Sequence, residues 1–335
     1  MRKSLKLSAA AIALTLALAG CGGSNDLESV DFKDQGKGKA PSVSFDTPLS
    51  VKDEDSRVLD KGDGEDVKEG DTVLVDAAVF SGADQKSQGD TYSGSPITIT
   101  VNDQLKEKLP KVYDILKDTK VGTSFAYAKK PEDNSSQGSS GGSDDKDASA
   151  VEIYTVSKKL KKSAEGSEVP PQEGLPKVTM KDSGPEISIP EGQEEPKSVT
   201  AQNLIDGSGD EVKDGEKVYV KYSGVTWSDG KQFDSNWTKD PTGFPLDQVI
   251  KGWGEGLKGK KVGDRVLLEV PTDKAYGSKE QLGSESQQPA GPLVFVIDIL
   301  GTSKADPPED SQGGSGMQQG GQQGGAQQGA QQGAQ

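Results

Sequence analysis

The chain has 335 residues, of which 39 are basic and 54 acidic, so its formal net charge is −15. This balance leaves no basic stripe to replace phosphate counterions, which argues against nucleic acid as a partner. The chain has no histidine and a single cysteine, which excludes Ser-His-Asp and Cys-His catalysis, most zinc sites and any intramolecular disulfide.

Hydrophobic residues make up only 30% of the chain, which also has 43 glycines and 18 prolines. A chain of this length is typical of two domains or three. Because so much of it cannot be core, we expect linkers or tails to take up a good part of it.

The N-terminus has the layout of an export signal. Basic residues at positions 2, 3 and 6 precede an apolar stretch at 7–18. That stretch is too short to span a bilayer comfortably, because a spanning helix needs about 20 apolar residues. It runs into the sequence LAGC, which ends at Cys21 and resembles a bacterial lipobox. The resemblance implies cleavage before Cys21, a lipid on its sulfur, and an exported protein anchored to the extracytoplasmic face of the bacterial cell membrane. The alternatives are an ordinary signal peptide cut nearby and an uncleaved anchor.

Polar segments flank and divide the rest of the chain. Residues 22–43 are polar and glycine-rich, so we expect a flexible tether. A second linker, rich in Pro, Glu and Gly, is expected near 168–195. Residues 303–335 end in a mixture of Gln, Gly and Ala that cannot form a core, which predicts a disordered tail.

An internal repeat lies between these segments. Three stretches match in the same order and at similar spacing, which favours two copies of one fold. The matching pairs are 58–70 with 204–215, 71–77 with 216–222, and 116–122 with 257–263.

The second copy combines strand-like alternation with one amphipathic helix. Residues 218–222 alternate in the manner of a half-buried strand. Val249, Trp253 and Leu257 recur every four residues and form one face of a short helix. Three glycines in that helix each cost about 1 kcal/mol relative to alanine, so it persists only if a sheet packs over it. Strands with one helix and no βαβ alternation predict an α+β domain, an antiparallel sheet wrapped around the helix.

Six motifs in this copy resemble the FKBP-type peptidyl-prolyl cis-trans isomerase family. In chain order they are VKYSG, DGKQFDS, VIKGWGEGL, VGDR, KAYG and LVFVIDIL. The resemblance covers about residues 198–302, and six ordered motifs are far more specific than any single one. It implies two FKBP-like domains, each an antiparallel sheet wrapped around a short helix, of which the first has diverged.

The resemblance also implies an apolar pocket for a proline ring, with Trp253 as its floor. In the family, the backbone N–H at Ile250 and the hydroxyl at Tyr276 form hydrogen bonds with ligand carbonyls. Each aromatic residue alone is more typical of ordinary core, and their occurrence together favours the pocket. The implied site residues are Tyr222, Phe233, Asp234, Val249, Ile250, Trp253, Tyr276 and Phe295.

The second copy departs from the family pattern at several positions. Thr242 stands where a second aromatic residue is common, which leaves the place of Phe244 in the pocket open. Lys239 stands for the arginine that pairs with the turn aspartate, which keeps the charge but loses the bidentate fork. The flap after Tyr276 is longer and more polar than usual, with Gln287 near a common apolar position. These departures bear on macrolide affinity and substrate preference.

The first copy departs further. Ala77 replaces Tyr222, Val112 replaces Trp253, and residues 131–149 are a Ser/Gly/Asp-rich insertion where the flap should be. We therefore expect no prolyl pocket in this copy.

These observations predict a peptidyl-prolyl cis-trans isomerase that assists the folding of exported, proline-containing polypeptides and needs no cofactor or metal. Macrolide inhibitors of the family are further candidate ligands. The alternative is a non-catalytic chaperone or peptide-binding lipoprotein with the same fold, but the near-complete aromatic set favours turnover. A solute-binding lipoprotein would need two large α/β lobes, which the pattern does not show.

The sequence thus predicts six segments. They are a signal peptide (1–20), a lipidated flexible tether (21–43), a degenerate FKBP-like domain (44–165), a linker (166–197), an FKBP-type isomerase domain (198–302) and a disordered Gln/Gly-rich tail (303–335).

Overall fold

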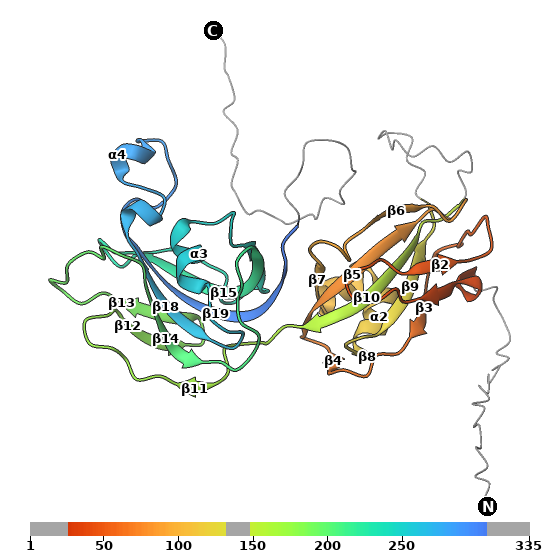
Figure 1. Ribbon diagram of the computed structural model, residues 1–335, viewed down its shortest axis with the longest axis horizontal. Helices are drawn as coiled ribbons and strands as arrows, with labels where there is room; N and C mark the ends of the chain where they lie inside the picture. Colours follow the sequence, from red (N-terminus) through yellow and green to blue (C-terminus); the bar gives the residue numbers. More distant parts are fainter. Residues whose placement is uncertain (1–25, 132–147, 307–335) are drawn as a thin grey trace, which may run out of the picture.

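Two antiparallel sheets form the body of the protein, and their strands follow one order except for an extra edge strand in the second (Figure 1). The computed structural model describes residues 26–131 and 148–306. The first sheet has the order β3 (Glu54–Asp60), β9 (Ser124–Lys129), β10 (Val151–Lys159), β5 (Thr72–Phe80) and β6 (Ser87–Asp90), with β7 (Ile97–Thr100) also paired to β5. The second has the order β11 (Ser167–Glu168), β14 (Thr200–Asp206), β18 (Arg265–Val270), β19 (Leu293–Lys304), β15 (Glu216–Thr226) and β16 (Gln232–Ser235), with β17 (Thr242–Pro245) also paired to β15. This shared order supports the predicted internal repeat.

A short helix packs against one face of each sheet, α2 (Pro110–Leu116) in the first copy and α3 (Lys251–Leu257) in the second, whereas α4 (Lys279–Leu282) projects away from the sheet (Figure 1). The first copy also has α1 (Asp103–Lys108) and a separate ladder of β4 (Asp66–Lys68) with β8 (Asp118–Lys120). The second copy also has the 3-10 turn η2 (Thr272–Lys274). The predicted α+β class, with antiparallel sheets on short helices, is confirmed.

The glycines of α3 allow the helix to approach the sheet closely. A Cβ atom on Gly252 would lie 2.4 Å from Val270 Cγ1, and one on Gly256 would lie 2.2 Å from Leu268 Cδ1. Trp253 and Leu257 are buried in the same core cluster as these strand residues. The glycine-rich helix was predicted to need a sheet packed over it, and this packing is present. The packing outweighs the weak helix propensity of the three glycines.

Residues 26–44 differ from the predicted tether, because they are folded onto the first copy. They form the 3-10 turn η1 (Asp26–Ser29) and a hairpin of β1 (Asp31–Lys33) with β2 (Ser42–Ser44). Leu27 and Val30 are 0% and 2% exposed, in a cluster with Phe45 on the face of the sheet opposite α2. The segment is polar in overall composition, but its few apolar residues are spaced so that they pack on this face of the sheet.

Residues 166–197 likewise differ from the predicted linker. They contain β11 and a hairpin of β12 (Lys177–Lys181) with β13 (Gly184–Ser188). Ile187 of this hairpin packs with Trp227 and Leu267 on the face of the second sheet opposite α3. The sequences PSVSF at 41–45 and PEISI at 185–189 share one pattern. Each copy therefore begins with a hairpin that covers the back of its own sheet.

An apolar contact joins the two copies. Leu160, just after β10, is 3% exposed and belongs to a cluster with Leu74 of the first sheet and Tyr219 and Leu300 of the second. The N–H of Lys161 donates to the Leu300 carbonyl at 3.0 Å. The chain that passes between the copies is thus held by both sheets.

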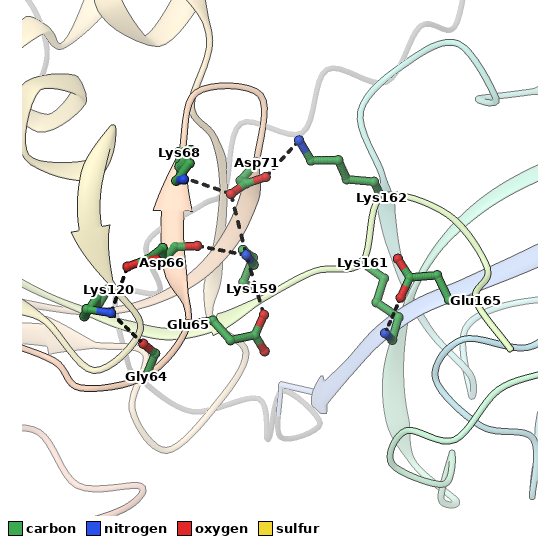
Figure 2. A network of polar contacts seen from close by, with 10 residues as sticks. All are labelled: Gly64, Glu65, Asp66, Lys68, Asp71, Lys120, Lys159, Lys161, Lys162 and Glu165. Carbon is green, nitrogen blue, oxygen red and sulfur yellow. Dashed lines mark hydrogen bonds and ion pairs between the residues drawn. The ribbon is translucent and has the colours of Figure 1, made fainter.

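A polar network flanks this passage on the side of the first copy (Figure 2). Asp71, only 6% exposed, accepts a hydrogen bond from the Lys68 N–H at 3.0 Å and forms an ion pair with Lys162 at 3.0 Å. Burial alone would raise the pKa of Asp71, but these partners outweigh it and lower that pKa. The aspartate therefore stays charged and holds Lys162 against the first copy.

Several predicted features lie outside the described residues. These are the signal peptide (1–20), Cys21, most of the first-copy insertion, and the tail from residue 307 onward. Within the described part of the chain, no helix is long and apolar enough to cross a membrane.

Candidate functional site

Trp253 stands at the centre of a group of aromatic rings between α3 and the second sheet. Three rings lie nearly perpendicular to it. Their centroids are 5.3 Å (Tyr222), 5.5 Å (Phe244) and 5.4 Å (Phe295) from that of Trp253, at interplanar angles of 84°, 76° and 89°. Phe233 in turn meets Phe295 at 5.7 Å and 88°. Edge-to-face pairs at these distances each contribute about 0.5–1.5 kcal/mol beyond burial, so the rings fix one another. We call these five residues the aromatic box.

Each ring of the box comes from a different element. Trp253 lies in α3, Tyr222 in β15, Phe233 in β16, Phe244 in β17 and Phe295 in β19. Trp253 and Phe295 are buried, at 4% and 3% exposure, and the other three rings are half-buried at the rim. The structure thus brings together all four aromatic pocket residues predicted on helix and strands, and it adds Phe244, whose place the sequence left open.

Gly224 of β15 makes room for two of these rings. A Cβ atom on it would lie 2.7 Å from Phe233 Cζ and 2.8 Å from Phe295 Cε1, which is closer than real Cβ atoms approach. Gly224 is paired with Phe295 across the β15–β19 ladder. The box therefore depends on this glycine for its width.

Tyr222 and Asp234 form the polar edge of the box. The Tyr222 hydroxyl donates a hydrogen bond to the Asp234 carboxylate. Burial, and after it this carboxylate, raise the pKa of Tyr222 well above its ordinary value of 10. In the described residues Lys239 forms no ion pair with Asp234, so the pairing implied by the family pattern is absent and the tyrosine takes its place.

Tyr276 and Ile250 supply hydrogen-bond donors at the same site. Tyr276 follows η2 and is 40% exposed, and burial of its remaining surface, with Asp234 nearby, raises its pKa above 10. Ile250 is the N-cap of α3, and its carbonyl accepts the Trp253 N–H at 2.9 Å. Its own N–H has no hydrogen-bond partner among the described residues. Val249 and Ile250 pack half-buried against the core that contains the box.

Asn236 is a positioning residue that the sequence did not indicate. It is 7% exposed, and its Oδ1 accepts the Tyr222 N–H at 2.7 Å. Its Nδ2 donates to the Val220 carbonyl and to Thr242 Oγ1, both at 3.0 Å. It thus ties the start of β17, which carries Phe244, to the strand of Tyr222. Its sequence signal, one asparagine after a strand, is the same as that of an ordinary turn.

The described residues of the first copy form no such box. The β5–β10 register places Val79 opposite Glu152, where the second copy has Gly224 opposite Phe295. Ala77 and Val112 are buried, in the places predicted from Tyr222 and Trp253. The only ring pair in the described part of this copy joins Phe125 and Tyr154, at 5.2 Å.

The site offers binding groups rather than reactive ones. It has apolar ring faces, two tyrosine hydroxyls held protonated and a free backbone N–H, and its one carboxylate is exposed. The buried Trp253 Nε1–H also has no partner among the described residues. Across that same part of the chain, no group of three or more Cys, Asp or Glu side chains is placed to hold a metal ion. Such a site can enclose an apolar ring and hold the carbonyls beside it.

Comparison with known proteins gives a family match within the second copy. The family model described as FKBP-type peptidyl-prolyl cis-trans isomerase matches residues 209–300. A probable FK506-binding protein of Corynebacterium glutamicum is 39% identical over 117 residues, which are 35% of this chain and 96% of that protein. The FKBP-type peptidyl-prolyl cis-trans isomerase FkpA of Escherichia coli is 41% identical over 100 residues, 30% of this chain and 36% of that protein.

Among solved structures, the crystal structure of FkpA from Escherichia coli matches with 33% identity and a TM-score of 0.29. That match covers 40% of this chain and 54% of the other. The match to the Corynebacterium protein, at 39% identity over nearly all of that relative, decides the family. The chain therefore belongs to the FKBP-type peptidyl-prolyl cis-trans isomerase family and is an enzyme of that class.

Proposed function

We propose that the aromatic box is the site at which this enzyme turns Xaa–Pro amides between cis and trans. The observation that carries this assignment is Trp253, framed by three perpendicular rings beside the free Ile250 N–H. A proline ring fits against the apolar ring faces. By the family resemblance, the Ile250 N–H and the Tyr276 hydroxyl donate hydrogen bonds to the substrate carbonyls on either side of the proline.

The mechanism needs no covalent bond to form or break. The barrier to amide rotation is about 18–20 kcal/mol, and uncatalysed exchange at Xaa–Pro takes roughly tens to hundreds of seconds. At the twisted transition state the amide loses its resonance, so its carbonyl carries less charge separation than in the planar ground state. An apolar site therefore stabilises the transition state more than the ground state.

Binding energy comes from the ring faces and the donors. Burial of an apolar side chain is worth about 1.5–3 kcal/mol, and a proline ring against Trp253 and Phe295 is comparable. The Ile250 N–H and the Tyr276 hydroxyl hold the flanking carbonyls while the bond turns, which lowers the entropy cost of reaching the twisted state. Asp234 fixes Tyr222 at the edge of the box through the hydroxyl hydrogen bond.

The client chains in this proposal are exported, proline-containing polypeptides. The LAGC sequence at Cys21 supports a lipid anchor on the outer face of the membrane. Proline isomerisation is slow enough to limit folding there. Replacement of Cys21 by Ala is expected to release the mature protein from the membrane fraction. An unchanged membrane fraction, with no lipid mass on the N-terminal peptide, would contradict the anchor.

The first copy is, in this proposal, a degenerate member of the same family without turnover. It keeps the strand order but has Glu152 and Val79 where the box has Phe295 and Gly224. Macrolide inhibitors of the family would then bind the second copy alone, with one ligand per chain by calorimetry.

The assignment is tested by cis–trans exchange of a short Xaa–Pro peptide with the full chain. Trp253→Leu is expected to abolish the acceleration, because it removes the ring that the other three contact. Trp237→Leu is the matched control, since Trp237 contacts Arg265 outside the box and packs with the hairpin side of the sheet. Equal loss in both variants, with both folded, would contradict the site. A folded full chain with no acceleration would favour the alternative, a non-catalytic chaperone or peptide-binding lipoprotein.

A further inference from the structure

A second hollow lies on the face of the second sheet opposite α3. It is a cavity of about 840 Å³, within the range of roughly 300–1,000 Å³ that is typical of ligand pockets. Its floor consists of alternate residues of β14 and β18, including Leu204 and Leu267. Val266 and Leu268, the neighbours of Leu267, face the core under α3 instead. The cavity and the aromatic box are therefore on opposite faces of one sheet.

One wall of this cavity is the free edge of a strand. Residues 177–180 of β12 all line it, and because alternate side chains point to opposite faces, the cavity runs along the edge of the strand. β12 pairs only with β13 among the described strands, through a two-residue turn after Lys181. In such a hairpin the N–H and C=O groups of Val178 and Met180 point away from β13. Neither residue's backbone has another hydrogen bond within the described residues.

The first copy shows what occupies the equivalent groove. There the chain before β1 turns inward as η1, and Leu27 and Val30 are buried against the back of the sheet. Arg57 of β3 holds this segment, because its Nη1 donates to the carbonyls of Leu27 and Glu28 at 2.8 Å and of Val30 at 3.1 Å. A polypeptide segment with two apolar side chains fills this groove.

The strand registers show that the second copy lacks the first of these two apolar anchors, while Pro176, at the position of Val30, is buried. Phe32 lies opposite Val43 in the first hairpin, as Val178 lies opposite Ile187 in the second. Five residues earlier in each copy stand Leu27 and Glu173. The buried anchor of the first copy is thus replaced by an exposed glutamate that lines the cavity.

The holding arginine is replaced as well. Arg57 lies opposite Ala126, and Gln202 lies opposite Leu267, at equivalent positions of the two sheets. Gln202 lines the cavity, and its Nε2 donates to the Asn203 carbonyl of its own strand at 2.8 Å. The second copy therefore has the groove without the buried leucine or the arginine contact that close it in the first copy.

Charge around the cavity favours a basic occupant. Glu168 and Glu173 line it and have no ion-pair partner among the described residues. Arg265 of the floor is neutralised by Asp298, through bonds of 2.6 and 2.8 Å. Lys177 is left as a single positive charge against two negative ones.

We propose that this cavity binds a short segment of an unfolded client polypeptide. The segment places an apolar side chain where the first copy has Leu27, and its main chain bonds to the free edge of β12. Basic residues beside the apolar ones match Glu168 and Glu173. The choice of a client chain as occupant rests on the proposed function. A chain held here on one face of the sheet raises the local concentration of its prolines near the box on the other.

The test uses the full chain and a fluorescein-labelled, proline-free peptide, LKSVKFK, which is residues 27–33 with both acidic residues changed to lysine. Glu173→Leu restores the apolar anchor of the first copy and is expected to weaken peptide binding about tenfold or more. Glu191→Leu, at an exposed position outside the cavity, is the matched control. The acidic peptide LESVEFE and an N-methylated LKSVKFK are both expected to bind more weakly, the latter because it cannot pair with a strand edge.

The outcomes separate this proposal from the isomerase assignment. Peptide binding that survives Trp253→Leu, with acceleration of Xaa–Pro exchange unchanged in Glu173→Leu, supports two independent sites. Binding lost in Trp253→Leu, or unaffected by Glu173→Leu, overturns the cavity site. Concentration-dependent dimers that Glu173→Leu abolishes would overturn the client in favour of a second copy. Absence of exchange activity with intact, Glu173-dependent peptide binding would contradict the isomerase site alone.

Discussion

Gly224 decides whether the aromatic box can form. It faces Phe233 and Phe295 at distances that leave no room for a methyl group, and the diverged first copy has a valine there. We predict that Gly224→Ala lowers kcat/KM for an Xaa–Pro peptide about tenfold, since displaced rings lose about 1.4 kcal/mol of transition-state contact. Exchange kinetics and urea unfolding on the same samples check this. Full activity at unchanged stability would show that the rings shift without consequence.

Tyr222 and Asp234 act as one unit at the edge of the box. Their hydrogen bond orients the ring that meets Trp253, and the raised pKa of Tyr222 keeps the hydroxyl a donor. We predict that Tyr222→Phe and Asp234→Val each lower kcat/KM about fivefold, which is about 1 kcal/mol, and that the double variant loses no more than either single one. A double-mutant cycle measures this. Additive losses would assign the two groups separate contacts with the substrate, and unchanged turnover in Asp234→Val would remove its role.

Among the elements of the second sheet, β18 carries an unusual buried carboxyl group. Glu269 is 5% exposed, its Oε1 has no hydrogen-bond partner among the described residues, and burial raises its pKa above the ordinary 4.5. The folded protein therefore binds more protons than the unfolded chain between pH 4.5 and the raised pKa. The free energy of unfolding must therefore fall as pH rises through that window. Below the window the carboxyl group is protonated, so burying it costs no charge desolvation.

This gives a prediction for Glu269→Gln, which keeps the size of the side chain without its charge. The variant is expected to have a higher free energy of unfolding than the natural protein at pH 7, by about 1 kcal/mol or more, with the difference shrinking toward pH 4. Urea unfolding at pH 4, 5, 6 and 7 measures it, with exposed Glu191→Gln as control. A difference that does not change with pH would contradict the burial of an ionisable group.

The sequence predicted those elements whose pattern is local. Alternation at 218–222 and the Trp253 face of α3 are set by periods of two and about four residues, so the strand and the helix could be predicted from the pattern, whereas the residues of the box came from the family resemblance. The two hairpins could not, because each buries only a few apolar residues within polar stretches. Ile187 looks like a linker residue until Trp227 and Leu267 are known to lie beneath it. Asn236 and Gly224 act through contacts distant in sequence, which no local period records.

At the scale of the whole molecule, each folded copy includes a hairpin in addition to its sheet and helices. The β12–β13 hairpin covers a cluster on the back of the second sheet that includes Val225, Val294 and Val296. The domain predicted from sequence, 198–302, leaves out this hairpin and would expose that cluster to water. The two copies are also in direct contact through the apolar cluster around Leu160, so they are not joined by a flexible linker alone.

Two pieces of the chain, 198–302 and 166–306, differ in whether they include the β12–β13 hairpin. Burial of one large apolar side chain is worth about 1.5–3 kcal/mol, so loss of the hairpin should lower the free energy of unfolding by ~3 kcal/mol or more. The shorter piece is also expected to self-associate, because a contiguous apolar patch is exposed. Urea unfolding and light scattering at equal concentration measure both. The aromatic box is on the other face, so whatever fraction of 198–302 is folded should still accelerate Xaa–Pro exchange. Equal stability of the two pieces would mean that the hairpin lies on the sheet without stabilising it.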